Sequence, residues 1–183
     1  MRLCWIISED FASTHITADQ IKDIAPSWGS WRTWRAWNTD NVLCHDAVKA
    51  RELIQRTFHL VCNFYTANKN YAILERPSKV NLYEGDFPVA LDRPEEIIAM
   101  HLVANQNDLV LLLGFDLSEK TNDDRFENHK RLNYINAFRA ALNSHVNTQW
   151  VLIDHPGEVT KKITLPNLSK DSFDSVLKQL KNT

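Results

Sequence analysis

Short apolar runs alternate along this chain with longer segments in which apolar residues recur at helical spacing. Residues 109–113 are the most hydrophobic run and hold no polar side chain, which is typical of a strand buried on both faces. Strands that alternate with helices favour a mostly parallel sheet, because each helix carries the chain back to the edge where the next strand begins. The expected strands are residues 3–7, 42–44, 80–83, 109–113, 150–153 and 161–165.

Capping signals and apolar spacing predict helices between these strands. Thr17 and Gln20 have the spacing of a capping box, and Asp92 is expected to cap a helix with Pro94 in its first turn. Residues 57–65 suit a helix by their spacing, but their β-branched and aromatic side chains make a strand the alternative. The expected helices are residues 18–25, 46–65, a segment beginning at Asp92, residues 126–142, and a last segment that buries Phe173, Val176, Leu177 and Leu180.

The alternation predicts one α/β domain over residues 1–183, a Rossmann-like three-layer sandwich with a mostly parallel sheet. A chain of 183 residues that is 44% apolar can bury a core without disulfides, and its three cysteines, with no Cys-x-x-Cys pair, suit an intracellular protein. The net charge of -2, without long single-sign runs, predicts no duplex DNA partner. The apolar start is too short for a signal peptide, and no stretch approaches the ~20 apolar residues of a membrane span. We therefore expect a cytoplasmic protein with no membrane partner.

Acidic residues follow the expected strands. Open parallel α/β sheets bind ligands beyond the carboxyl ends of their strands, where loops and helix starts converge. Three of the four glycines, Gly85, Gly114 and Gly157, fall in the same strand-end loops, although glycine gathers in turns for reasons of backbone freedom alone. The residues that we expect to share a cleft at this rim are Glu9, Asp10, Glu84, Asp86, Asp116, Asp154 and His155.

The rim carboxylates suit three chemistries: a cradle for sugar hydroxyls, a site for a hard cation such as Mg²⁺, or a general acid and base pair. Asp116 ends the most buried strand, and the imidazole of His155 titrates near ~6.5 when unperturbed, so these two are the expected catalytic residues. The alternative is that such a carboxylate only caps a helix or forms a turn. The carboxylates suit Mg²⁺ as a cofactor, and no motif in the sequence indicates a different one. If the protein is an enzyme, it is expected to be a transferase or hydrolase acting on a nucleotide or nucleotide sugar.

Four of the six tryptophans stand at every third position from residue 28 to residue 37, in a segment expected to be a loop, with Arg32 and Arg35 between them. In a helix the last three would spread over about a third of the circumference, whereas an extended or 3₁₀ segment would align them on one edge. Indole rings stack on bases or sugars and guanidinium groups bind phosphate, so Trp31 and Trp34 are expected to stack on a ligand whose phosphate Arg32 and Arg35 hold. Core packing or a subunit contact would use the same residue types.

Several familiar signatures are missing. No Gly-x-Gly-x-x-Gly follows the first strand and no Gly-x-x-x-x-Gly-Lys-Ser/Thr occurs, so an NAD oxidoreductase and a P-loop ATPase are not expected. His-Glu-x-x-His, paired cysteines and Gly-x-Ser-x-Gly are also absent, which disfavours a zinc hydrolase and a serine esterase. Cys44, His45 and Asp46 are adjacent and cannot readily converge on one ion, so a helix start is expected there rather than a metal site.

Two resemblances carry further expectations. Residues 95–104 and 108–118, with Gly114-Phe115-Asp116, resemble a helix and strand of Rossmann-like bacterial glycosyltransferases of the sialyltransferase and motility-accessory-factor type. In that family a strand ending in Gly-x-Asp reaches the nucleotide-sugar cleft, which implies a binding role for Asp116. The whole sequence, and especially residues 28–35 and 150–156, resembles uncharacterised proteins of tailed phages of marine bacteria, which implies action in the cytoplasm of an infected cell or in a virion.

The leading hypothesis is therefore a protein whose strand-end rim binds a nucleotide or sugar phosphate, with Asp116 and Glu84 meeting hydroxyl groups. The competing hypothesis is a non-catalytic phage structural or host-interaction protein, in which the tryptophan-rich segment contacts a second copy, a virion protein or a host protein. A third hypothesis, binding of single-stranded nucleic acid, conflicts with the acidic rim and the net negative charge.

Overall fold

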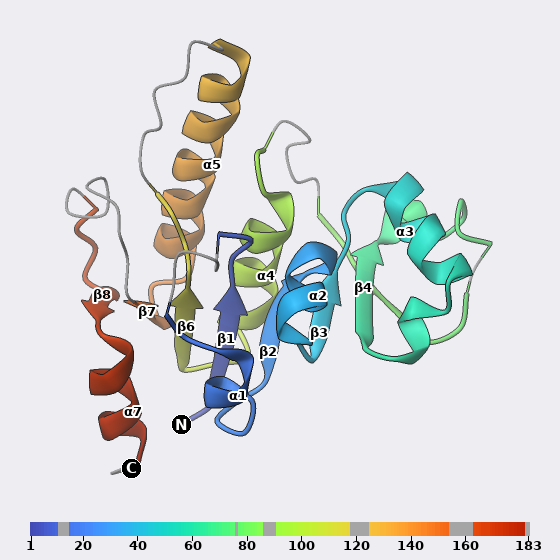
Figure 1. Ribbon diagram of the computed structural model, residues 1–183. Coiled ribbons are helices and arrows are strands. Elements are labelled where there is room, and N and C mark those ends of the chain that lie inside the picture. The colour runs from blue at the N-terminus through green and yellow to red at the C-terminus, as the bar shows by residue number, and fades with distance from the viewer. Residues whose placement is uncertain (11–14, 76, 86–90, 118–124, 154–162, 182–183) are drawn as a thin grey trace.

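Eight parallel strands form one sheet in the computed structural model, which describes residues 1–10, 15–75, 77–85, 91–117, 125–153 and 163–181 (Figure 1). The order across the sheet is β5-β4-β3-β2-β1-β6-β7-β8, and every neighbouring pair is parallel. The predicted α/β class is confirmed. The strands are β1 (Leu3–Ile7), β2 (Ser27–Ser30), β3 (Asn41–Leu43), β4 (Asn63–Ala67), β5 (Val80–Tyr83), β6 (Leu109–Leu113), β7 (Gln149–Ile153) and β8 (Leu168–Asp171).

Helices cover both faces of the sheet and give three layers. Ile6 and Leu112 point toward α4 and α5 on one face, whereas Trp5 and Leu111 point toward α1, α2 and α7 on the other, as the alternation of side chains along a strand requires. The helix α3 packs on Val42 and the other residues of the second face at β3 and β4. The helices are α1 (Ala18–Ile21), α2 (Trp31–Trp37), α3 (Ala47–Gln55), α4 (Pro94–Ala104), α5 (Arg125–Ser144) and α7 (Phe173–Lys181), with 3₁₀ turns η2 (Phe58–Leu60) and η3 (Asn68–Asn70).

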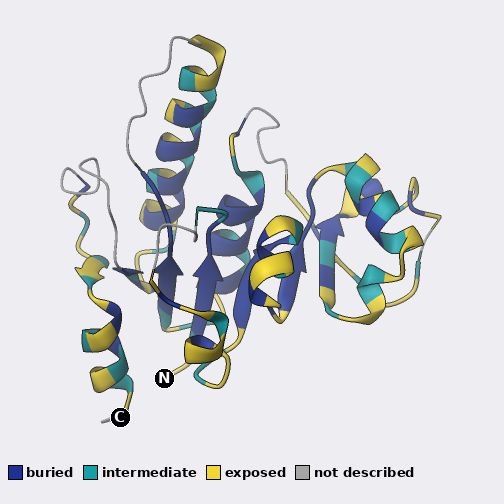
Figure 2. Ribbon diagram, in the orientation of Figure 1, coloured by how far each residue is buried: buried dark blue, intermediate teal, exposed yellow. Residues whose placement is uncertain are grey.

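The helix α4 is buried on nearly all sides, because it packs against β1 and β2 and lies beside α5 on the same face of the sheet (Figure 2). Its middle is a run of apolar residues, and Pro94 stands in its first turn as predicted. The N-cap position belongs to Arg93 and not to the expected Asp92, and no side chain caps the helix there. The helix runs opposite to the strands, so its first-turn acids Glu95 and Glu96 are buried at the carboxyl edge of the sheet.

The strand order reverses between β1 and β6. From β1 the chain builds β2 to β5 on one side of the sheet, and it then crosses back to place β6, β7 and β8 on the other side. The two central strands pair over their whole length, from Leu3 opposite Leu109 to Ile7 opposite Leu113. Open α/β sheets bind ligands near such a reversal, at the carboxyl ends of the strands. Gly114 follows β6 with a φ of 74°, a left-handed conformation that favours glycine.

The prediction of one helix over residues 46–65 was wrong beyond Gln55. The helix α3 ends there, Thr57 adopts a left-handed φ of 59°, and the chain continues through η2 into β4, so the alternative of a strand was closer. The apolar spacing misled because Val48 and Val61 are 80% and 66% exposed and belong to no core. Phe64, by contrast, points into the sheet face that α3 covers.

Three smaller predictions also differ from the structure. The tryptophan-rich segment is not a loop but forms β2 and α2, and the helix expected over residues 18–25 covers only Ala18–Ile21. The last strand is β8 and not residues 161–165, of which 163–165 form no strand and 161–162 lie outside the described residues. None of the helices in the described ranges has both the length and the apolar content that a membrane crossing requires.

Candidate functional site

Glu96 is the centre of a hydrogen-bond network at the carboxyl edge of β1. Its Oε1 atom accepts from Ser8 Oγ at 2.6 Å and from the Glu9 amide at 3.0 Å, and its Oε2 atom accepts from the Tyr134 hydroxyl. The side chain is buried, and burial raises the pKa of Glu96 to about 7, against the opposing effect of Arg93. This one carboxyl group joins the end of β1 to α4 and α5.

Two arginines neutralise the acids at this central part of the rim. Arg93 Nη1 lies 2.5 Å from Asp10 Oδ2 and 4.0 Å from Glu96 Oε1. Arg131 is buried, donates to the Asp116 carbonyl oxygen, and has Nη2 at 3.6 Å from the Asp116 carboxylate. The predicted carboxylates Asp10 and Asp116 therefore face guanidinium groups and not an open acidic cleft.

Neither arginine was predicted from the sequence as part of the site. Each comes from a helix that the pattern did predict, but the pairing across the rim depends on how α4 and α5 are placed. The available signal was the pair Glu95-Glu96 at the head of an otherwise apolar segment, because two acids at the start of a fully buried helix require buried partners.

Glu9 connects this network to the tryptophan-rich segment. Arg32 Nη1 donates to the two Glu9 carboxylate oxygens at 3.1 and 3.2 Å. Arg35 does not reach this position; its guanidinium lies over the Trp31 ring, 5.1 Å from the ring centroid. One of the two predicted phosphate-binding arginines thus faces the rim, and the other lies beside the indole.

A cavity of about 520 Å³ opens beside the rim, beyond the carboxyl ends of β3 and β4. It extends from the start of α2 to the first turn of α4. Three cationic side chains from three elements line it: Arg32 of α2, Lys49 of α3 and Lys69 of η3. The ammonium group of Lys69 forms no ion pair with any residue that the structure describes.

The acidic and imidazole groups at this cavity are held by other parts of the protein. The His45 amide donates to Glu95 Oε1 at 3.0 Å, and His45 Nδ1 lies 2.8 Å from the Tyr83 hydroxyl. Burial, with a further contribution from Lys69, lowers the pKa of His45, and burial raises the pKa of Glu95. Asp46 Oδ1 accepts from the Lys49 amide at 2.6 Å and so caps α3.

The indole of Trp31 forms one wall of the cavity and carries three cations. Lys49 Nζ lies 4.3 Å from its ring centroid, and the guanidinium carbons of Arg32 and Arg35 lie 4.9 and 5.1 Å away. Ser30 positions this wall, because its Oγ atom accepts from the Arg32 amide and the Thr33 amide at the start of α2.

The other tryptophans of the segment pack inward. Trp28 and Trp37 are buried in cores on opposite faces of the sheet. Trp34 is half-buried and meets Phe58 edge-on, with ring centroids 4.5 Å apart, so it does not line the cavity. Of the two rings expected to stack on a ligand, only Trp31 is at the site.

The remaining predicted residues lie apart from this cavity or outside the described residues. Glu84 accepts from Asn68 Nδ2 at 3.3 Å and, with Lys69, lines a neighbouring cavity of about 350 Å³. Asp86, Asp154 and His155 fall outside the described residues. Within the part of the chain that is described, no three or more His, Cys, Asp or Glu side chains gather in a way that could hold a metal ion.

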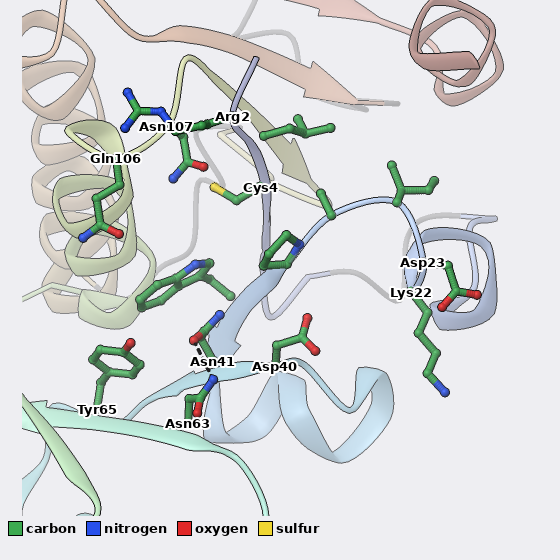
Figure 3. A pocket seen from close by; sticks show the side chains of 15 residues that line it. Arg2, Cys4, Lys22, Asp23, Asp40, Asn41, Asn63, Tyr65, Gln106 and Asn107 are labelled. Carbon is green, nitrogen blue, oxygen red and sulfur yellow. Dashed lines mark hydrogen bonds between the residues drawn. The ribbon is translucent and has the colours of Figure 1, made fainter. Parts of the chain in front are cut away.

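A second and larger cavity, of about 840 Å³, lies at the opposite edge of the sheet, at the starts of β1 to β4 (Figure 3). Asn41, Asn63, Tyr65, Gln106 and Asn107 contribute most of its polar groups. This cavity was not predicted from the sequence, because its residues come from four strands, from the segment between α1 and β2 and from the turn after α4, which only the fold brings together.

Fold and rim together define the class of this protein: a parallel α/β protein with a Rossmann-like three-layer architecture and a charged rim at the carboxyl ends of its central strands. Comparisons of the chain with family models, with curated proteins and with solved structures find no match.

Proposed function

We propose that the cavity beyond β3 and β4 binds the phosphate of a nucleotide or sugar phosphate. The carrying observation is that Arg32, Lys49 and Lys69 line one cavity from three separate elements, while Lys69 has no acidic partner among the described residues. Arg32 is paired with Glu9 and Lys49 with Glu52, so the unmatched positive charge at the cavity is that of Lys69, and a phosphate group supplies the missing negative charge beside all three cations.

The acids near the cavity do not cancel its preference for an anion. Asp92 lies 3.4 Å from Arg131 Nη1, and Asp46 accepts the Lys49 amide at the start of α3. Burial favours the neutral form of Glu95. Among the cations that line the cavity, Lys69 is the one without an acidic partner in the described ranges, whereas Lys49 Nζ lies 2.7 Å from Glu52 Oε2 and Arg32 pairs with Glu9.

The size and walls of the cavity suit a ligand with a ring beside its phosphate. A volume of about 520 Å³ lies in the range of ~300–1,000 Å³ typical of small-molecule sites. The Trp31 indole offers a flat face for a base or sugar, as the sequence analysis expected of this residue. The glycosyltransferase resemblance agrees with a nucleotide-bearing ligand, and group transfer or hydrolysis, with Asp116 and His155 as catalytic residues, stays a prediction.

Thermal denaturation with a ligand panel tests the proposal. Nucleoside mono- and diphosphates and sugar phosphates, each with and without Mg²⁺, should raise the Tm in a concentration-dependent way, because a ligand that binds only the folded state stabilises it by mass action. The Lys69→Ala variant should lose most of the shift. Lys178→Ala on α7 is the matched control, because it removes an equally exposed ammonium far from the cavity.

A flat response across the panel would refute phosphate binding. A shift retained in both Lys69→Ala and Arg32→Ala would place the ligand at another site and would refute the assignment of this cavity. Comparing the two variants with wild type at equal ligand concentration separates these results from a general change in stability.

A further inference from the structure

The cavity at the amino edge of the sheet is bounded by a row of side chains in register. Trp28 pairs with Asn41, and Asn41 pairs with Asn63, so the three stand side by side across β2, β3 and β4. They share the sheet face on which α4 packs, because Leu43 belongs to that face and Asn41 stands two residues before it. The helix α4 contacts β1 and β2, and the row continues from beneath it onto β3 and β4.

The polar groups around this cavity have unused hydrogen-bonding capacity. Asn63 Nδ2 donates to Asn41 Oδ1 at 3.3 Å, and Asn41 Nδ2 donates to the Ser27 carbonyl at 3.2 Å. The carboxamide oxygen of Asn63, the Tyr65 hydroxyl and the whole Gln106 carboxamide have no hydrogen-bond partner in the described ranges. Gln106 and Tyr65 lie on the same side of the cavity in Figure 3.

Charge does not select the ligand here. Arg2 and Lys22 are matched by Asp23 and Asp40 around the cavity. Arg2 also pairs with Asp108 at 3.4 Å, and Asp40 Oδ2 accepts from the Ser27 amide and hydroxyl at 2.8 Å each. With equal numbers of the two charges, the lining favours neither an anion nor a cation.

The remaining chemistry is that of amides and aromatic rings. Carboxamide and hydroxyl groups donate and accept at once, which suits adjacent hydroxyl groups of a ligand. Tyr65, half-buried, and Trp28 lie 4.8 Å apart between ring centroids and supply an apolar surface next to those amides. A sugar ring has the matching arrangement, with hydroxyl groups around its edge and C–H bonds on its faces.

We propose that this cavity binds an uncharged, hydroxyl-bearing ring, as found in a monosaccharide or in the ribose of a nucleoside. A volume of about 840 Å³ gives room for such a ring and a second group attached to it. The site is separate from the phosphate site, because the two cavities share no lining residue and lie at opposite edges of the sheet.

Saturation-transfer NMR with two sets of uncharged ligands tests this proposal. One set holds monosaccharides and disaccharides, the other nucleosides without phosphate, and the set that gives signal identifies the source of the ring. For the strongest ligand, Gln106→Ala and Tyr65→Phe should each weaken binding about fivefold in a calorimetric titration, as expected for one lost hydrogen bond. Asn105→Ala removes a neighbouring exposed amide outside the cavity and should leave the Kd unchanged.

Lys69→Ala separates this proposal from the phosphate site. Binding of the uncharged ring should be unchanged in that variant, whatever the phosphate panel shows. The proposal is overturned if neither ligand set binds wild type, or if the Tyr65→Phe, Gln106→Ala double variant binds as tightly as wild type. Both side chains reach the surface, and circular dichroism of the double variant confirms that the fold is retained.

Discussion

The two edges of the sheet use polar groups in opposite ways. At the carboxyl edge, charged groups satisfy one another: Glu96 accepts three hydrogen bonds, and Arg93 lies between it and Asp10. At the amino edge four neutral amides stand among two acids and two bases, and Gln106 and Asn63 retain donors or acceptors that no described residue meets.

This difference separates polar groups that hold the fold from those that are open to a ligand. A buried carboxyl group that accepts hydrogen bonds from several donors fixes the elements that carry those donors. Its acceptor capacity is then already used and is not open to a ligand. The ligand sites that we propose therefore lie beside the central network and at the far edge, where cations or amides still lack partners. Four measurements test this division, from the largest expected effect to the smallest.

Replacing Glu96 should be the most damaging of these changes. Glu96→Ala leaves the Ser8 hydroxyl and the Tyr134 hydroxyl without their acceptor and removes one of the acids facing Arg93. We expect a loss of about 3 kcal/mol in the free energy of unfolding, measured in urea, because buried groups are left unpaired. The control Glu127→Ala on the surface of α5 should change it by less than about 0.5 kcal/mol. Equal effects of the two variants would contradict a structural role for Glu96.

Gly29→Ala should follow in size. A Cβ atom at Gly29 would stand 3.0 Å from the Cβ and Cγ2 atoms of Thr33, at the first turn of α2. Overpacking of this kind costs about 1–3 kcal/mol, and the added strain falls on the helix that carries Trp31 and Arg32. The double variant Gly29→Ala, Thr33→Ser, which removes the Cγ2 atom, should recover part of the loss in the same urea titration. No recovery would show that the contact with Thr33 is not the cause.

Two tyrosines compare the edges directly. The Tyr134 hydroxyl donates to Glu96 in the interior, so Tyr134→Phe should lower the free energy of unfolding by about 1–2 kcal/mol. The Tyr65 hydroxyl has no partner among the described residues, so Tyr65→Phe should lie within about 0.5 kcal/mol of wild type. Thermal denaturation of both proteins without ligand measures the difference. If Tyr65→Phe lowered the free energy of unfolding more than Tyr134→Phe does, the amino edge and not the carboxyl edge would hold the polar groups that stabilise the fold.

The edges should also respond to pH in opposite directions. Burial raises the pKa of Glu96 to about 7, so the folded state binds more protons than the unfolded state between about pH 4.5 and 7, and this contribution to stability is lost as pH rises through that window. Burial lowers the pKa values of His101, in the last turn of α4, and of His145, directly after α5, and their Nδ1 and Nε2 atoms lie 2.9 Å apart. Below about pH 6.5 the unfolded state therefore binds more protons at these two histidines than the folded state does, so the free energy of unfolding decreases as pH falls.

Unfolding titrations from pH 4.5 to 8 separate the two contributions. Glu96→Gln should remove the decline in stability toward pH 7, and His145→Asn should reduce the decline toward acid pH. If either variant keeps the complete wild-type pH profile, the corresponding group does not titrate as its burial requires.

The sequence predicted those parts of the fold in which one strong pattern acts alone. β6 and the apolar segment of α4 follow from composition, and the strand–helix alternation leads from them to a parallel sheet. The segment from Gln55 to Tyr65 could not be assigned in this way, because apolar residues at helical spacing turned out to be exposed there. β2 is four residues long and includes Gly29, which leaves no periodicity to detect.

The candidate site was predictable in location but not in composition. The carboxyl edge followed from the strand ends, and Trp31 and Arg32 are at a cavity there. The partners of the acids were not predictable, since Arg93 and Arg131 meet Asp10 and Asp116 only when two helices are packed on the sheet. No pattern in the sequence indicates the cavity at the amino edge, because single asparagines next to a strand are common turn residues.

The pairing of β1 with β6 has a consequence for synthesis of the protein. Leu3 to Ile7 must wait for residues 109–113 before one of their two edges is covered, a separation of about 100 residues. At ~5–20 residues per second, a ribosome takes about 5–20 s to cover that distance. During this time one edge of an apolar strand with a central tryptophan is open to pairing with other chains, so we expect the newly made protein to associate more readily with its own copies than the folded protein does.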